Sequence, residues 1–319
     1  MRGTFTLGRI AGIRITANWT VLVIAALVTA TVGGTLLPRA VDELNPAAAW
    51  ALGLLSALLL LGSIAAHELG HAITARRAGI TTDEITLWLF GGVAKLTADA
   101  TTPSDEMRIA VAGPAVSATL AVSAAAAATL GSVAGLHLAL IVVLAYLALV
   151  NGSLAIFNMI PGLPLDGGRV LRGYLWKRRG DRLSATITAA RLGRFLGAAL
   201  MVWGLWTFLG GGSGLWTAAI GYFIRRSATA ELREAQVQRL LETPLGTAVG
   251  QMFARVYGAP GNGTPVNGTP VNGAPVNGSP IDGSPIDVTS WETPPTYPPG
   301  TSAESAASGP TPTTDRIPS

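Results

Sequence analysis

Three polar residues in one short motif have the types and spacing needed for metal chemistry. His67, Glu68 and His71 form the pattern His-Glu-x-x-His within a long apolar stretch. Residues four apart share one face of a helix, so the two imidazoles can converge on a single ion. Glu68 lies one step round the helix from His67, where it can reach a water beside the metal. In zinc hydrolases with this arrangement, the histidines bind the metal and the glutamate is the general base.

A structural cluster of hydrogen-bonded side chains is the alternative interpretation of this motif. The motif lies inside an apolar stretch, where polar groups without partners would be destabilising. Ionisable residues at membrane depth usually mark function. The position of the motif therefore favours a metal site.

The elements that carry this motif are predicted to be membrane-spanning helices. The 319 residues are 49% hydrophobic and only 13% charged, whereas soluble domains carry about 25% charged residues. These proportions argue against a soluble globular protein and against a disordered one. A span needs about 20 mostly apolar residues, and the candidate segments are Ala17–Leu37, Ala48–Ala72, Ile109–Gly131, Leu136–Met159, Ala189–Leu209 and the shorter Gly214–Ile224.

Two of these segments have an alternative interpretation. The first could be a signal peptide, but its apolar core exceeds the usual length of about 7–15 residues. The shortest, Gly214–Ile224, could be an amphipathic hairpin or a re-entrant piece. Trp216 and Tyr222, followed by Arg225 and Arg226, are typical of a membrane interface and favour a span.

The basic residues lie almost entirely on one side of the predicted membrane. With the N-terminus inside, the inner segments contain every Lys and Arg of the 22 in the chain except Arg39. Cytoplasmic segments of membrane proteins carry such an excess. We therefore expect a multi-pass protein of the cell membrane with both termini cytoplasmic. This orientation accounts for the net charge of +4 without a nucleic-acid partner.

A third metal ligand has few candidates, because the chain has no Cys and only one further histidine, His137. His137 lies at the outer end of a span, whereas His71 lies about 7–8 Å from the inner interface. The two interfaces are about 30 Å apart, which excludes His137 as a ligand and suits an interfacial role. Asp166 lies at the inner depth, after an irregular Pro- and Gly-rich stretch. A helix cap or a pair with Arg169 is the alternative for Asp166.

Two motifs in distant parts of the sequence occur together and are accompanied by two shorter ones. These are His67–His71, Asn158-x-x-Pro161-x-x-x-Leu165-Asp166-Gly167, Phe90-Gly91-Gly92-Val93 and Ala112-Gly113-Pro114. In this combination, residues 1–226 resemble the site-2 protease family of intramembrane zinc metalloproteases. Without an insertion large enough for a PDZ domain, the chain resembles the compact six-span branch of sporulation-type processing proteases.

The resemblance implies a role for each residue of these motifs. His67, His71 and Asp166 would bind one Zn²⁺ ion, and Glu68 would act as the general base. Asn158 would hold the substrate backbone or the oxyanion, although a hydrogen bond to a neighbouring carbonyl is an alternative.

A short membrane-associated β-hairpin is expected over residues 85–96. Ile85, Leu87 and Leu89 alternate with polar residues or Trp88, as in a short strand. Gly91 and Gly92 would allow close approach of a substrate strand, and an ordinary turn is the alternative. The expected fold is thus an all-α polytopic membrane protein with about six transmembrane helices and this hairpin.

The composition changes after the last apolar segment. We expect a transmembrane metalloprotease domain over 1–226, a cytoplasmic mixed or amphipathic segment over 227–257, and a disordered tail over 258–319. The tail contains a five-residue repeat from Asn262 that is rich in Asn-Gly and Gly-x-Pro turns. Compact relatives often carry a CBS pair after the membrane domain; here Leu240–Val256 could only be a remnant of one.

The expected function is hydrolysis of peptide bonds in or next to the transmembrane segment of membrane-bound regulatory proteins. The family resemblance suggests a single-span substrate, such as an anti-sigma factor. A zinc-dependent amidase acting on lipids is one alternative, but no acyl-chain tunnel is indicated. An inactive scaffold or a metal transporter is another, but a transporter should have polar residues along several spans, and here they cluster at one level.

Overall fold

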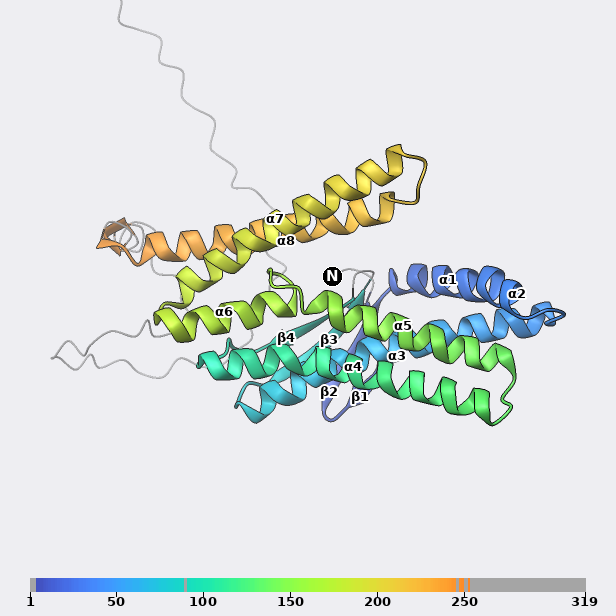
Figure 1. The fold of residues 1–319 in the computed structure, drawn as a ribbon. Helices are drawn as coiled ribbons and strands as arrows, with labels where there is room; N and C mark the ends of the chain where they lie inside the picture. Colours follow the sequence, from blue (N-terminus) through green and yellow to red (C-terminus); the bar gives the residue numbers. More distant parts are fainter. Residues whose placement is uncertain (1–3, 89–90, 245–246, 250–251, 253–319) are drawn as a thin grey trace, which may run out of the picture. The chain divides into compact units, whose positions relative to one another are not determined.

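The structure is a computed structural model that describes residues 4–88, 91–244, 247–249 and 252. It is mostly helical, as predicted, with one small sheet (Figure 1). The strands are β1 (Thr4–Ile10), β2 (Ile13–Asn18), β3 (Thr82–Trp88) and β4 (Gly91–Leu96). The helices are α1 (Val21–Thr31), the π-helical η1 (Val32–Leu36), α2 (Leu37–Ala40), α3 (Pro46–Arg77), α4 (Pro103–Val133), α5 (Leu138–Asn158), α6 (Asp166–Arg179), α7 (Arg182–Leu209) and α8 (Leu215–Leu241).

Among the described residues, five helical segments are long and apolar enough to cross a membrane. They are Val21–Ala40, Pro46–Arg77, Pro103–Val133, Leu138–Asn158 and Arg182–Leu209, and they match the first five predicted spans. The sixth predicted segment forms the start of α8, which is not among the five, so a sixth crossing stays a prediction. The domain boundary predicted after residue 226 lies within α8.

Side chains that cap the backbone explain where several long helices begin. The Asn45 side chain accepts a hydrogen bond from the backbone of Ala47 at the start of α3, and Thr102 accepts one from Asp105 at the start of α4. At the start of α5, the cap is His137, whose Nδ1 accepts from the Ala139 N–H at 3.2 Å. His137 is therefore a capping residue at a helix end.

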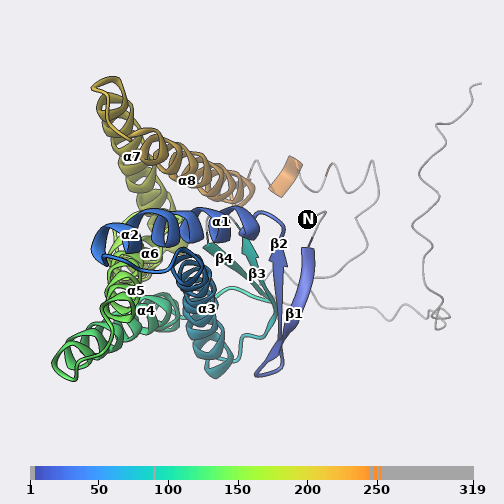
Figure 2. The same cartoon turned by 90° about the vertical axis from the view of Figure 1, so that its right-hand side faces the viewer.

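The sheet has four strands, not only the two of the predicted hairpin. Its order is β1-β2-β3-β4, with β2 and β3 parallel and the outer pairs antiparallel. The antiparallel β3–β4 pair is the expected hairpin. The first helix starts at Val21 instead of residue 17, because Ile13, Ile15 and Ala17 form one buried strand face that packs with Ala72 of α3. Figure 2 shows β1 at one edge of the sheet and β4 at the other.

The later helices pack in a connected series, in which α6 contacts both α4 and α7. Helix α4 packs against α3, α5 and α6, while α7 and α8 form a long antiparallel pair (Figures 1 and 2). Glycines allow the α7–α8 pair to approach closely, since a Cβ at Gly204 would overlap the backbone of α8 at Ala218. The predicted tail over 258–319 lies outside the described residues, as do residues 245–246, 250–251 and 253–256 of the possible CBS remnant.

Candidate metal centre

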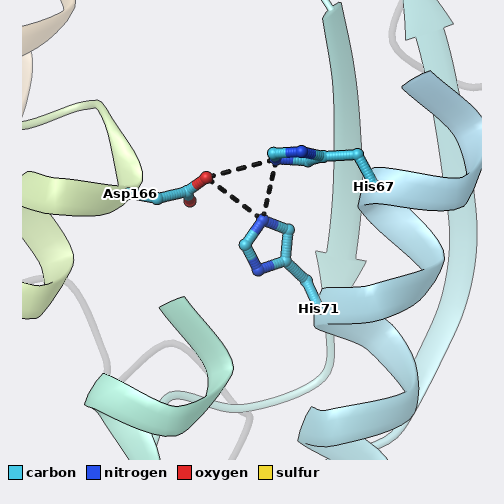
Figure 3. Close-up of side chains that lie close together, drawn as sticks. All are labelled: His67, His71 and Asp166. Carbon is cyan, nitrogen blue, oxygen red and sulfur yellow. Dashed lines mark hydrogen bonds and ion pairs between the residues drawn. The ribbon is translucent and has the colours of Figure 1, made fainter. Parts of the chain in front are cut away.

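Three side chains from two distant elements meet at one point (Figure 3). His67 and His71 extend from α3, and Asp166 is the first residue of α6. The Nε2 atoms of the two histidines are 3.2 Å apart, and each lies 3.2 Å from Asp166 Oδ2. His67 is 4% exposed, His71 5% and Asp166 9%. The structure thus brings together the three residues expected to bind a metal.

The spacing of these donor atoms fits a zinc ion. Ligand atoms about 2.0–2.1 Å from a tetrahedral Zn²⁺ lie roughly 3.3 Å from one another, and the observed separations are 3.2 Å. Two imidazoles and one carboxylate also match the ligand set of catalytic zinc sites, which use three protein ligands. His137 is not a member of the group of potential ligands found in the described residues.

Helix α4 holds both imidazole rings through hydrogen bonds to their Nδ1 atoms. His71 Nδ1 lies 2.7 Å from the backbone oxygen of Ile109, and His67 Nδ1 lies 2.9 Å from Ser117 Oγ. Between these two contacts lies Gly113, where a Cβ atom would overlap Nε2 of both histidines. The absence of a side chain at Gly113 therefore creates the space in which the rings converge.

The roles of Ile109, Gly113 and Ser117 were not predicted from the sequence. The signal available was the Ala112-Gly113-Pro114 element, which was noted only for its family resemblance. Its physical role depends on which face of α4 meets α3. In a helix made largely of small apolar residues, periodicity does not indicate that face.

A tight chain reversal places Asp166 at the start of α6. The backbone before it folds against the first turn of α6, where a Cβ at Gly167 would overlap Met159 and one at Gly168 would overlap Gly162 and Leu163. The Leu163 N–H also donates to the Ala189 oxygen of α7 at 3.2 Å. The glycines after Asp166 are thus required by close backbone contact, which fixes the position of the carboxylate.

A buried ion cluster ties α6 to α4 near the metal centre. The Glu106 side chain is only 1% exposed, and it accepts hydrogen bonds from Arg169 Nε at 3.3 Å and from an Arg172 guanidinium nitrogen at 2.5 Å. Arg169 is thus paired with Glu106, one turn along α6 from Asp166. The cluster joins α4, which is hydrogen-bonded to both histidines, to α6, which carries Asp166. It therefore helps to fix the position of Asp166 relative to the histidines.

We expect Glu106→Gln to lower the free energy of unfolding by about 3–5 kcal/mol, because breaking a buried ion pair leaves uncompensated buried charge. Equilibrium unfolding in mixed micelles measures this change. Asp99→Asn is the matched control, because it breaks an ion pair with Arg182 in which the aspartate side chain is 75% exposed. Exposed pairs contribute only about 0–1 kcal/mol, and equal losses in the two variants would contradict the prediction.

The electrostatics of the control pair are also defined by the structure. Desolvation by the nearby protein acts to raise the pKa of Asp99, but the hydrogen bond and positive charge of Arg182 outweigh it and hold this pKa below its usual value. Asp99 is therefore ionised at neutral pH, and any stability from this pair is lost only as the pH falls through the lowered pKa.

The candidate ligands line a cavity of about 320 Å³. Glu68 lies in its wall beside Gly92 of β4, where a Cβ atom would overlap the Glu68 carboxylate. Asn158 also lines the cavity, and its Nδ2 donates to the Leu154 oxygen at 3.0 Å. Gly91 lines the same wall with a φ of +133°, a conformation that favours glycine. All the expected site residues therefore surround one space.

Comparison with known proteins agrees with this geometry. The profile of Peptidase family M50 matches residues 55–140 and 132–203, a region that includes the paired histidines and Asp166. The chain belongs to peptidase family M50, the site-2 protease family. As an M50 chain, it shares its fold with a solved site-2 protease from Methanocaldococcus jannaschii, at 27% identity and a TM-score of 0.50. That match covers 72% of this chain and 95% of the solved one.

Two relatives of this M50 chain are named as zinc metalloproteases. Rip3 of Mycobacterium tuberculosis is 45% identical over 82% of this chain, and a Synechocystis protein is 37% identical over 76% of it. The matches cover 66% and 63% of those relatives, so this chain spans slightly less than two thirds of their length.

Proposed function

We propose that this chain is a zinc metalloendopeptidase that cleaves peptide bonds in or next to the transmembrane segments of membrane-bound regulatory proteins. The observation that carries the proposal is the triangle formed by His67, His71 and Asp166, with Glu68 in the wall of the same cavity. Both histidines lie on a helix long and apolar enough to span a membrane. The family membership and the names of the relatives support the same activity.

The residues that line the cavity would have different roles in peptide hydrolysis. His67, His71 and Asp166 would hold one Zn²⁺ ion, which polarises a carbonyl and lowers the pKa of water. Glu68 accepts a proton from the attacking water and passes it to the leaving amine. The Asn158 amide, which lines the cavity, would stabilise negative charge on the carbonyl oxygen through the Nδ2 hydrogen that is not donated to Leu154. This division requires no covalent intermediate with the protein.

A substrate helix must unwind before it can be cut, because helical hydrogen bonds engage its carbonyl groups. β4 is the last strand in the sheet order, so its outer edge can pair with an added strand. Gly91 and Gly92 lie at the start of β4 and line the cavity with Glu68. We propose that the unwound substrate pairs with this edge, which would bring its scissile carbonyl into the cavity lined by His67, His71 and Asp166.

The basic residues support an orientation with both termini in the cytoplasm and the centre near the cytoplasmic face. The proposed substrates are single-span proteins of the cell membrane, with anti-sigma factors as the type to test first. Mass spectrometry of products from the purified protein and a single-span substrate in lipid nanodiscs tests the activity. New peptide termini near the inner end of the span are expected, whereas fatty acid release without peptide products would support the lipid amidase instead.

We expect Asp166→Ala to lower the zinc content of the purified protein well below one ion per chain, since one of three ligands is lost. His137→Ala is the matched control and should keep the wild-type zinc content, because that ring caps α5. Atomic absorption after dialysis against a weak chelator measures both. Full zinc retention by Asp166→Ala would show that the third ligand lies elsewhere.

A further inference from the structure

The two candidate zinc ligands on α3 are held by different kinds of hydrogen-bond partner. His71 Nδ1 faces the Ile109 carbonyl oxygen at 2.7 Å. A carbonyl only accepts, so a neutral His71 carries its hydrogen on Nδ1 and directs the Nε2 lone pair toward the centre. His71 is therefore set in the tautomer that can bind a metal.

The tautomer of His67 is not fixed in the same way, because its Nδ1 faces a hydroxyl and not a carbonyl oxygen. Ser117 Oγ lies 2.9 Å from His67 Nδ1, and a hydroxyl can either donate or accept. If Ser117 donated, neutral His67 would carry its hydrogen on Nε2, directed at Asp166 and His71. If Ser117 accepts, the hydrogen is on Nδ1 and Nε2 offers its lone pair. The hydroxyl therefore determines whether His67 can act as a ligand.

We propose that Ser117 is a positioning residue that accepts a hydrogen bond from His67 Nδ1–H and so holds Nε2 ready to bind zinc. The inference rests on the proposed zinc chemistry of the site. Ser117 is fully buried at 0% exposure and His67 is 4% exposed, so solvent is poorly placed to replace the hydroxyl. Hydrogen bonds to the second nitrogen of metal-binding histidines fix ring orientation and raise ligand basicity.

The packing of α4 against α3 makes this contact specific. Gly113 and Ser117 are four residues apart and share one face of α4. On this face, Gly113 leaves space for the two imidazole rings, and Ser117 presents the hydroxyl that contacts His67. The helices approach closely here, since a Cβ at Gly70 of α3 would lie 2.9 Å from the Ala112 oxygen. Ser56 behaves differently, because its hydroxyl donates to Leu52 within its own helix at 2.7 Å.

The test is zinc affinity of the full chain in detergent, measured by competition with a chromogenic chelator. Ser117→Ala should weaken zinc binding about 10–100-fold, the usual effect of removing such a partner. Ser56→Ala is the matched control, because it removes an equally buried hydroxyl (0% exposed) away from the His pair, and it should stay within about twofold of the wild type. The visible spectrum of the Co²⁺-loaded protein should change in Ser117→Ala and not in Ser56→Ala.

Thermal unfolding of the metal-free variants separates positioning from general packing. The metal-free Ser117→Ala and Ser56→Ala proteins should unfold at similar temperatures. Zinc affinity of Ser117→Ala within threefold of the wild type would overturn the inference, as would a much lower unfolding temperature for this variant than for the control. If the wild type itself binds no zinc, the proposed function fails; if it binds zinc and cleaves while Ser117→Ala binds equally well, only this inference fails.

Discussion

Glu68→Gln is expected to lower the rate of peptide cleavage about 10²–10⁴-fold, the usual contribution of a general base. The amide keeps the size and shape of the side chain but cannot accept the proton of the attacking water. Glu68 is not one of the three residues of the ligand triangle, so zinc content should stay at the wild-type level. Cleavage of a fluorogenic peptide in detergent, with zinc measured on the same sample, tests both statements.

Glu234→Gln is the matched control for this substitution, because Glu234 is an exposed residue of α8 that does not line the cavity of the candidate metal centre. It should cleave the peptide at the wild-type rate. Turnover by Glu68→Gln within tenfold of the wild type would remove Glu68 from its proposed role. Loss of zinc in Glu68→Gln would instead give this carboxylate a part in holding the metal.

Gly113→Ala is expected to reduce activity by at least about 100-fold, the scale of loss when catalytic groups are displaced by about 1 Å. The added methyl group would overlap Nε2 of both His67 and His71, the atoms that would bind the metal. Neither ring can move away freely, because both are hydrogen-bonded through Nδ1 to α4 itself. Zinc titration of the purified variant should therefore show weakened binding along with the lost activity.

Gly152→Ala provides the control for a glycine-to-alanine change within a membrane helix. A Cβ at Gly152 of α5 would lie 3.8 Å from the Ala121 Cβ, which is an ordinary van der Waals contact. This variant should keep its zinc and activity, since alanine is favoured over glycine in a helix interior by about 1 kcal/mol. Equal behaviour of the two variants would show that the space at Gly113 is not required.

The two parts of the candidate metal centre, the histidine pair and Asp166, were predictable to different degrees. His67 and His71 are four residues apart, so helix periodicity alone brings them to one face. Asp166 is far from the histidines in the sequence. Its predicted depth in the membrane suggested a metal ligand, but a helix cap or a pair with Arg169 was left as an alternative role. In the structure, Arg169 pairs with Glu106, and Asp166 points at the histidines.

The sheet shows a different limit of sequence reasoning. The β3–β4 hairpin was expected from alternation around Ile85 and Leu87, but β1 and β2 were not. The short alternating strand around Ile13 and Ile15 runs directly into the apolar residues of α1, so it is hidden at the edge of a hydrophobic span. Its parallel pairing with β3 joins residues about 70 positions apart and is not a local property.

The sequence by itself determined the apolar helices, the paired imidazoles and the neighbouring Glu68, because hydropathy and the period of 3.6 residues act over short stretches of chain. Only the tertiary structure decided which face of α4 meets α3, and with it the roles of Gly113, Ile109 and Ser117. The ion cluster of Glu106 with Arg169 and Arg172 was likewise decided only by the tertiary structure, because it joins two helices that are far apart in the sequence. These contacts depend on how helices dock, and docking is governed by side-chain shape and close approach across the whole fold, which no single segment of sequence encodes.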